Sequence, residues 1–385
     1  MAPLPRADML AKDKFSYVFG GARIQSYNDP AARGPGSHTI RSLAWNPLGQ
    51  LIATGSADRT LRIWNPERAA ARYSTELRGH SAAVEAVHFN PVRDAELASC
   101  SADGTVRFWD VRSKNCVSRL DVGGEAFTLS WSVDGSTMVV GRKVRDLQSP
   151  GTPLNVKPTN NEQDDILIPI EIKSPSTPTI LPDGSSDSSK TTSTYTALSQ
   201  YPQNVQTNAT TFFNGMSTEE DPNLYFFATT GEGDVKIMTV PSFETVHTLK
   251  ASTCACAAVS MAPSGRYLAI GSSDSLITLW DTTDWHCCRG LEGGANAAIR
   301  GVSWSFDGRF LCGASDEPGT GGHGLDIFYA DTGEIVHTVP PTGANATIPA
   351  VAWHPSRYWL AYSTTNDGPS GTGGLKIVGA GSTTL

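Results

Sequence analysis

The sequence predicts an all-β fold made of seven similar units arranged in a ring. Short runs in which apolar and polar residues alternate, as in half-buried strands, recur along nearly the whole chain. Turn signals separate these runs in a chain of 385 residues that contains 37 Gly and 24 Pro. The runs group into units of three or four strands over residues 38–380, which predicts a seven-bladed β-propeller.

The unit Gly79–Ser113 is the best formed of the seven. It opens with Gly79-His80, closes with Trp109-Asp110, and contains a strand, a turn and a second strand between these pairs. A Gly-His to Trp-Asp unit of this kind resembles the WD40 repeat, which forms one four-stranded blade of a propeller. The equivalent aromatic residues of units two and three, Phe89 and Trp131, lie 42 residues apart, within the spacing of WD repeats.

The seventh unit ends after its third strand and lacks an outer strand. A short alternating run, Arg23-Ile24-Gln25-Ser26-Tyr27, precedes the first unit. We expect this run to supply the missing strand, because that pairing covers an exposed edge and closes the ring. The sequence therefore predicts one propeller domain over residues 23–380, an N-terminal tail over 1–22 and a C-terminal tail over 381–385.

The third unit is interrupted by two polar tracts, residues 144–163 and 173–200. The second tract has 14 Ser or Thr among its 28 residues, so both are predicted to be mobile low-complexity insertions in blade three. The run over 165–172 between them is interpreted as the delayed third strand, although Pro169 is expected only at a sheet edge or bulge. Ser-Pro and Thr-Pro pairs in the tracts match proline-directed phosphorylation sites and also arise by chance in such compositions.

Four polar residues of the second unit, His80, Ser99, Asp103 and Trp109, stand where WD repeats often carry a buried hydrogen-bond chain. A His, Asp and Ser set also has the composition of a hydrolase triad. The sequence has no G-x-S-x-G nucleophile motif, so we interpret the four residues as a structural network. No catalytic residue is predicted, and the chain is not expected to be an enzyme.

Charged residues are predicted at one rim of the central channel. Arg41, Glu85 and Arg300 each lie four residues before the aromatic residue of their unit, at the start of the innermost strand. Arg59 follows the turn aspartate of the first unit and is placed on the same rim. These side chains are either simply solvated or form a partner-binding rim.

Two motifs with cofactor-binding character are interpreted as structural. Gly319–Gly324 matches G-x-G-x-x-G but leads into a strand, whereas dinucleotide binding requires a following helix. The pairs Cys254/Cys256 and Cys287/Cys288 lack the spacing of structural zinc sites and suit small buried side chains. Neither a cofactor nor a metal is predicted.

Composition argues against several classes of protein. The net charge of −8 disfavours a domain that coats nucleic acid by itself. Seven scattered cysteines fit a reducing compartment better than a disulfide framework. The sequence contains no run of 18 apolar residues and no apolar signal segment at its start, so neither membrane insertion nor secretion is expected.

A more specific resemblance rests on an ordered set of segments outside the best-formed unit. It includes the run Tyr225–Gly233, the segment Cys254-Ala255-Cys256 followed by Pro263–Asp281, and the ending Val351–Pro355. Together with units one and two, these segments resemble the family of THO complex subunit 3, the WD-repeat member of the transcription–export (TREX) assembly. The resemblance covers residues 38–143 and 211–380.

This resemblance implies a nuclear, non-catalytic scaffold that couples transcription to mRNA processing and export. Its partners would be the large helical subunits of the THO complex and, indirectly, a DEAD-box RNA helicase and mRNA export adaptors, with no membrane partner. Direct contact with RNA is left open. The alternatives are another WD40 adaptor, such as a ubiquitin-ligase substrate receptor or a splicing-associated propeller, and an enzyme that uses the channel.

Overall fold

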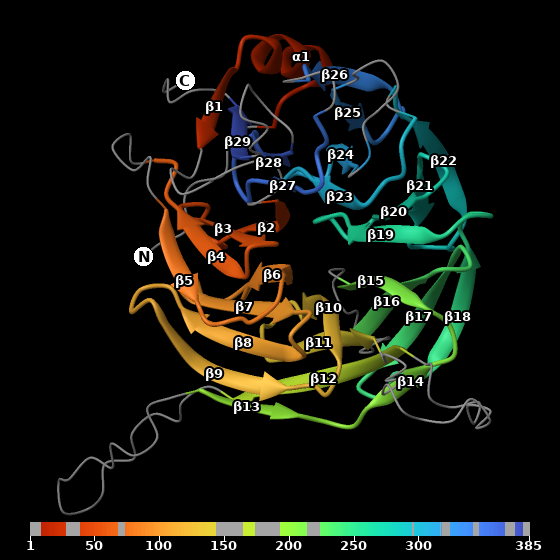
Figure 1. Cartoon of the computed structure of the whole chain (residues 1–385). Coiled ribbons are helices and arrows are strands. Elements are labelled where there is room, and N and C mark those ends of the chain that lie inside the picture. The colour runs from red at the N-terminus through yellow and green to blue at the C-terminus, as the bar shows by residue number, and fades with distance from the viewer. Residues whose placement is uncertain are drawn as a thin grey trace, which may run out of the picture.

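The chain folds into seven β-sheets that surround a central channel (Figure 1). The computed structural model describes residues 9–27, 39–67, 74–143, 165–173, 193–213, 224–294, 296–315, 317, 324–341, 346–365 and 374–379. Each sheet is an antiparallel blade with one edge strand on the inside of the ring and the other edge at the outside. The predicted seven-bladed propeller is confirmed.

The strands of the first four blades follow one another along the chain. Blade one contains β2 (Ile40–Trp45), β3 (Ile52–Ser56), β4 (Thr60–Trp64) and β5 (Thr75–Arg78). Blade two contains β6 (Val84–Phe89), β7 (Glu96–Ser101), β8 (Thr105–Asp110) and β9 (Asn115–Asp121). Blade three contains β10 (Glu125–Trp131), β11 (Thr137–Lys143), β12 (Asp165–Lys173), β13 (Thr194–Ala197) and β14 (Tyr201–Gln203). Blade four contains β15 (Thr207–Phe212), β16 (Leu224–Thr230), β17 (Asp234–Val240) and β18 (Thr245–Lys250).

The last three blades complete the ring, and the seventh draws one strand from the N-terminus. Blade five contains β19 (Cys256–Met261), β20 (Tyr267–Ser272), β21 (Leu276–Asp281) and β22 (Cys287–Glu292). Blade six contains β23 (Gly301–Trp304), β24 (Phe310–Ala314), β25 (Leu325–Tyr329) and β26 (Ile335–Val339). Blade seven contains β27 (Val351–Trp353), β28 (Trp359–Thr364), β29 (Gly374–Gly379) and β1 (Arg23–Tyr27).

The position of a strand within its blade decides which residues it carries. The second strands β3, β7 and β20 are buried at every residue because neighbouring blades cover both of their faces. They therefore combine apolar and small residues. At Gly55 in β3, an added Cβ would lie 2.7 Å from the Val84 side chain of the next blade. Outer strands such as β9 are mostly exposed, and their sequences are accordingly polar.

Blades one and seven meet at the closure of the ring. Strand β1 pairs antiparallel with β29, from Arg23 opposite Gly379 to Tyr27 opposite Leu375, as the sequence predicted. The buried His354 ring of blade seven donates from Nε2 to the Gly49 carbonyl of blade one at 2.9 Å. Gly49 has a φ of +72°, and an added Cβ would lie 2.3 Å from that ring, so only glycine suits this position.

Blade three differs from the prediction at its outer edge. The edge is shared by β13 and β14, which pair with successive parts of β12. Pro169 lies where β12 changes partner, and its carbonyl accepts a bond of 2.8 Å from the Leu198 amide. The missing Pro169 N–H therefore falls at the break between the two strands, where the ladder needs no donor.

The predicted insertions and tails need a correction at two places. Residues 194–197 form β13, and Tyr195 stacks on Phe108 of blade two with ring centroids 3.9 Å apart, so this end of the 173–200 tract is part of the sheet. Tyr195 supplies the apolar surface that the composition of the tract seemed to lack. Residues 144–163, 174–192 and 381–385 lie outside the described residues.

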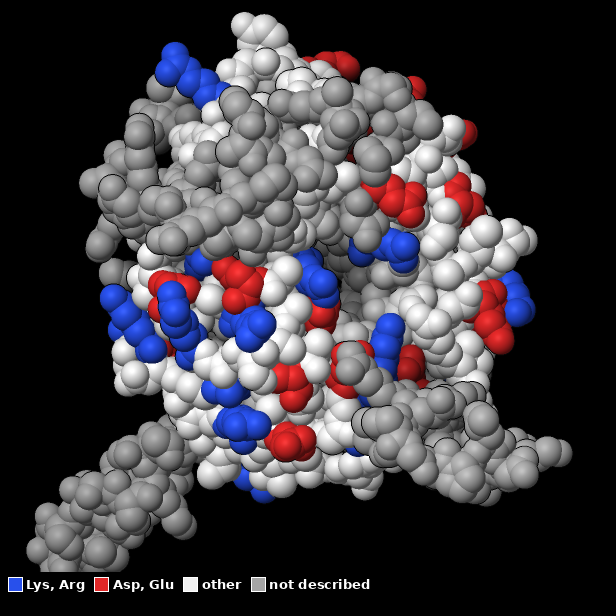
Figure 2. Space-filling view, in the orientation of Figure 1, with Lys and Arg blue, Asp and Glu red and all other residues white. Residues whose placement is uncertain are grey.

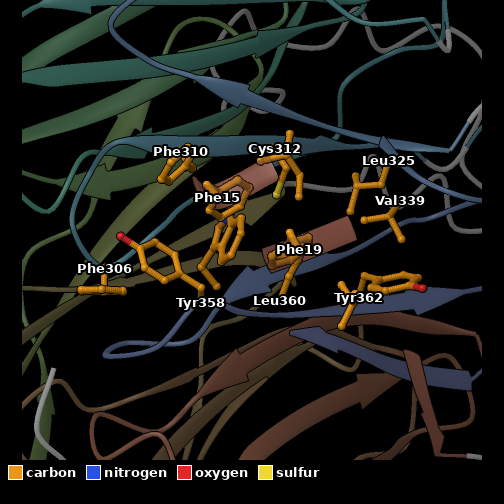
Figure 3. Packing of buried hydrophobic residues seen from close by; sticks show 13 residues of the cluster. Phe15, Phe19, Phe306, Phe310, Cys312, Leu325, Val339, Tyr358, Leu360 and Tyr362 are labelled. Atoms are coloured by element: carbon orange, nitrogen blue, oxygen red, sulfur yellow. The ribbon is translucent and has the colours of Figure 1, made fainter. Parts of the chain in front are cut away.

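The N-terminal segment is the second part of the chain that differs from the prediction. Residues predicted as a tail form helix α1 (Lys12–Gly20), which lies against β26. Phe15 and Phe19, four residues apart on one face of the helix, are 0% and 1% exposed. Figure 3 shows both rings inserted among residues of blades six and seven, and Phe15 stacks on Phe310 with centroids 3.9 Å apart. The prediction of a tail is therefore wrong for residues 12–20, because two aromatic residues four positions apart suffice to anchor a short helix whose other residues stay partly or fully exposed.

Replacing Phe15 by alanine should lower the free energy of unfolding by about 3–5 kcal/mol, because a fully buried ring leaves a cavity between two blades. Chemical denaturation of the full chain measures this change. Tyr17→Ala is the matched control, since the Tyr17 side chain is 86% exposed on the same helix and its loss should change the free energy by less than about 0.5 kcal/mol. Equal effects of the two substitutions would contradict the burial of Phe15.

Mild acid should destabilise the fold through its buried histidines. Burial lowers the pKa of His354 to about 4, from an ordinary value of 6.5, and burial has the same effect on His88. The unfolded chain therefore binds protons more readily between pH 6.5 and 4, so stability is complete above pH 6.5 and falls as the pH drops. The pKa of Asp103 is held below its ordinary value of 3.8, so this carboxylate stays ionised at pH 5.

We expect the free energy of unfolding to be about 1–2 kcal/mol lower per buried histidine at pH 5 than at pH 7. Denaturant titrations at both pH values test this expectation. His354→Gln should shrink the difference between them, because glutamine does not titrate, whereas the exposed His247→Gln should leave it unchanged. A pH difference that survives in His354→Gln would remove this histidine from the explanation.

Candidate functional site

The predicted polar network of blade two is a continuous chain of hydrogen bonds. His80 Nδ1 lies 2.9 Å from Asp103 Oδ2, and His80 Nε2 lies 2.8 Å from Ser99 Oγ. Trp109 Nε1 donates to the same Ser99 oxygen at 2.8 Å. The structure adds Thr105, whose hydroxyl donates to Asp103 Oδ1 at 2.6 Å. All four predicted residues therefore meet: Ser99 comes from β7, Trp109 from β8, Asp103 from the turn between them and His80 from the loop before β6.

Electrostatics and burial give this network a structural character. Burial opposes the charge of Asp103, but hydrogen bonds from Thr105, the Ser81 amide and His80 hold the pKa of its carboxyl well below the usual range. Burial lowers the pKa of His80 in spite of the neighbouring Asp103 carboxylate. The His80 side chain is 0% exposed, and Ser99 is also 0% exposed. A substrate cannot reach a hydroxyl that is covered and already engaged by Trp109 and His80.

Blades one and five carry shorter versions of the network. In blade one, Trp64 Nε1 donates to Thr54 Oγ1 at 3.1 Å, while Arg62 instead of a histidine donates to Asp58 at 2.8 Å. In blade five, the Ser252 hydroxyl donates to Asp274 at 2.7 Å. Ser252 precedes its inner strand by four residues, as His80 does, so the chain position could have identified it even though the residue type differs.

The predicted rim residues lie at one mouth of the channel. Figure 2 shows basic and acidic side chains gathered around the central hollow. Arg41 in β2 and Glu85 in β6 form an ion pair, whereas Arg59 is exposed in the β3–β4 turn with a φ of +72°. Arg300 is exposed directly before β23 and lines the channel. The structure therefore pairs Arg41 with Glu85 and leaves the two other arginines on separate blades.

A rim pocket of about 400 Å³ lies beside the Arg41–Glu85 pair. Its lining also includes Glu125, Phe127 and Lys143 of blade three, and Lys143 Nζ lies 5.2 Å from the centre of the Phe127 ring. Phe127 precedes Trp131 by four residues, the spacing that located Arg41 and Glu85. Phe127 was not among the predicted rim residues, which were all charged.

The channel itself is a cavity of about 830 Å³ lined by the inner strands. Small residues such as Ala44, Ser130 and Ser260 face it, and its ionisable lining residues are His88 and Arg300. Three inner-strand tryptophans each join their blade to the preceding one. Their indole N–H groups donate to backbone carbonyls at 3.1–3.3 Å: Trp45 to Ala352, Trp131 to His88 and Trp304 to Ser260.

The cysteines and the glycine-rich motif do not form a cofactor site in the described residues. All seven cysteines are free, and no cluster of three His, Cys, Asp or Glu side chains able to hold a metal occurs in the described ranges. Gly324 leads into strand β25, while residues 319–323 of the motif lie outside the described ranges. No described helix is both long and apolar enough to cross a membrane.

Two protein families match parts of the chain. The WD40 family (WD domain, G-beta repeat) matches residues 32–65 and 72–110, which contain most strands of blades one and two. The cytochrome D1 heme domain matches residues 219–357. The β-propeller domain of Cps50 (Swd1) from Myceliophteria thermophila covers 92% of this chain with a TM-score of 0.63 and 15% identity, so it supports the fold alone. The fold and its repeats define a WD40-repeat β-propeller.

Relatives extend this assignment to nearly the whole chain. THO complex subunit 3 of Arabidopsis thaliana is 28% identical over 332 residues, which cover 86% of this chain and 88% of that protein. WD repeat-containing protein AAC3 of Dictyostelium discoideum is 25% identical over 346 residues, or 84% of this chain and 61% of that protein. The chain is a WD40 propeller homologous to THO complex subunit 3 and to other WD-repeat proteins, and the resemblance predicted from the sequence is confirmed.

The described histidines of the segment that matches the cytochrome D1 heme domain do not form a haem site. Haem iron needs an axial ligand, most often histidine. Of the described histidines there, His247 and His286 are exposed, and the His337 ring packs edge-on against Phe19 with centroids 5.5 Å apart. Both ring nitrogens of His354 are already bonded, to Gly49 and to backbone amides of its own turn.

Removing the Asp103 carboxylate should lower the free energy of unfolding by about 1–3 kcal/mol, because Asp103→Ala leaves the buried Thr105 and His80 side chains and the Ser81 amide without this acceptor. Thermal and denaturant unfolding measure the change. Asp94→Ala removes a carboxylate from the surface pair with Arg112, whose side chain is 67% exposed, and should cost less than about 1 kcal/mol. An unchanged unfolding midpoint in Asp103→Ala would contradict a structural network.

Proposed function

We propose that the chain is a non-catalytic scaffold subunit of a THO-type transcription–export assembly in the nucleus. In this role it couples transcription to mRNA processing and nuclear export through contacts with other proteins. Its direct partners are the large helical subunits of that assembly. The DEAD-box RNA helicase and the mRNA export adaptors are reached indirectly.

One observation carries this proposal. The similarity to Arabidopsis thaliana THO complex subunit 3 extends over 86% of this chain and 88% of that protein, so it includes the irregular blades as well as the regular ones. Several other WD-repeat proteins match only one or two blades: "Ribosome biogenesis protein YTM1" and "Nuclear distribution protein nudF" cover 25% and 24% of this chain. WD repeat-containing protein AAC3 covers 84% of this chain at the lower identity of 25%.

The geometry of the described residues supports a role without catalysis. The residues that have the composition of a hydrolase triad, His80, Ser99 and Asp103, are buried and engaged with one another. Exposed charges instead surround one mouth of the channel. We place the partner contact at this rim, at Arg41, Arg59, Glu85 and Arg300, because charged groups there can steer and orient a protein partner.

Affinity purification of the full chain from nuclear extract tests the proposal. We expect the tagged chain to recover the THO subunits as a stoichiometric set. The double variant Arg41→Glu/Arg300→Glu should recover less than about a tenth as much, since two repulsive contacts at an interface each weaken binding severalfold or more. Exposed ion pairs contribute little to folding, so the variant should keep its unfolding midpoint.

The matched control is Arg112→Glu, which reverses an exposed charge at the end of β8, away from the channel. It should leave recovery unchanged. Recovery of cullin-type or splicing components without THO subunits would replace the proposed function with that of another WD40 adaptor. Full recovery with the double rim variant would move the contact to another surface while leaving the THO assignment in place.

A further inference from the structure

Three side chains at the outer edge of blade five form a chain that the proposed function does not use. Asp284, His286 and Cys288 alternate along the turn between β21 and β22 and the start of β22. Asp284 Oδ1 is hydrogen-bonded to His286 Nδ1, and Cys288 Sγ lies 3.5 Å from His286 Nε2. A carboxylate, an imidazole and a thiol therefore stand in the order found where a histidine activates a sulfur nucleophile.

The backbone explains why the three side chains meet. Trp285 between Asp284 and His286 has a φ of 57°, and its ring packs toward Phe227 of blade four with centroids 5.6 Å apart. The tryptophan is thus turned inward, and its two neighbours project outward, with their side chains about 60% exposed. Cys288 is half-buried against the core cluster between blades five and six, which fixes the sulfur relative to the ring.

The contacts set the direction of proton transfer. The Asp284 carboxylate accepts the proton on His286 Nδ1, so the lone pair of Nε2 is free to accept the thiol proton of Cys288. The same carboxylate stabilises the imidazolium that then forms. The thiolate, rather than the thiol, is the reactive form of cysteine.

We propose that Cys288 is a selectively reactive thiol, activated by His286, that forms mixed disulfides with small disulfides of the glutathione class. The Cys288 proton moves to His286 Nε2, and the thiolate attacks one sulfur of the small disulfide. One sulfur–sulfur bond forms to Cys288 as the bond within the small disulfide breaks. The departing thiolate takes the proton from the imidazolium, so the disulfide supplies all the oxidising equivalents.

The remaining cysteines provide the contrast that makes this site selective. Cys100, Cys256 and Cys312 are buried, and burial raises the pKa of each thiol. Burial also raises the pKa of Cys287, the immediate neighbour of Cys288 in β22. Cys116 is exposed like a reactive thiol, but its sulfur contacts the Ser118 carbonyl at 3.3 Å and not an imidazole. Exposure alone would therefore favour Cys116, Cys254 and Cys287, which are more exposed than Cys288, whereas activation favours Cys288.

To test this, the reduced full-length chain is treated with a limiting amount of oxidised glutathione at pH 7, and modified peptides are mapped by mass spectrometry over time. The order in which the cysteines react distinguishes activation by His286 from simple exposure. Cys288 should be modified first, about tenfold or more faster than Cys116 and Cys287. His286→Asn should reduce the Cys288 rate about tenfold or more. Asp284→Asn should cause a smaller decrease, because asparagine can still orient the ring but not stabilise its charged form.

Two further variants keep the test decisive. Cys116→Ser should leave the fast reaction intact, and Cys288→Ser should abolish it. The Asp284 and His286 variants should keep the unfolding midpoint of the parent chain, since these two side chains are exposed. Equal rates at all exposed cysteines, or a Cys288 rate that His286→Asn leaves unchanged at every pH, would overturn the proposal. Because the assay needs no partner protein, its outcome is independent of whether the chain assembles with THO subunits.

Discussion

Closure of the ring between blades one and seven is the constraint on which the rest of the structure depends. Each blade is covered by two neighbours, so a ring that stayed open would expose the faces of two blades and the bare edge of β29. Three contacts prevent this: the β1–β29 pairing, the His354–Gly49 hydrogen bond and the Trp45–Ala352 hydrogen bond. Helix α1 adds Phe15 and Phe19 to the adjacent space between blades six and seven. The channel and its rim exist only because this seam holds.

The fold was predictable because a strand's place in a blade determines its composition. Inner and second strands alternate or stay apolar, and turns carry glycine and aspartate, so seven units and the closing strand could be read from the chain. Helix α1 could not, because only Phe15 and Phe19 are deeply buried and the groove that receives them is built from residues about 300 positions away. The strand β13 was missed for a similar reason, since Tyr195 is partly buried by stacking on Phe108 of another blade.

The candidate site was predictable only in part. The network of His80, Ser99, Asp103 and Trp109 follows a spacing tied to strand positions, and its members indeed meet. The positions of the rim residues were also predicted from spacing within each repeat, but the contacts between side chains of neighbouring blades were not. That Arg41 contacts Glu85, while Phe127 and Lys143 complete a pocket beside them, depends on how neighbouring blades are rotated about the channel. The spacing of residues within one repeat does not show how neighbouring blades are rotated relative to each other.

Two polar triplets in this chain show how surroundings decide what similar groups can do. In blade two, His80 lies between Asp103 and Ser99, but burial and the bond from Trp109 leave the hydroxyl without access or spare capacity. In blade five, His286 lies between Asp284 and Cys288 at the surface, where a small molecule can approach the sulfur. The first set consumes its hydrogen-bonding capacity in holding a blade together. The second set lies at the surface, so the thiol chemistry that we propose belongs at the outer edge of the propeller and not in the buried network that has the composition of a hydrolase triad.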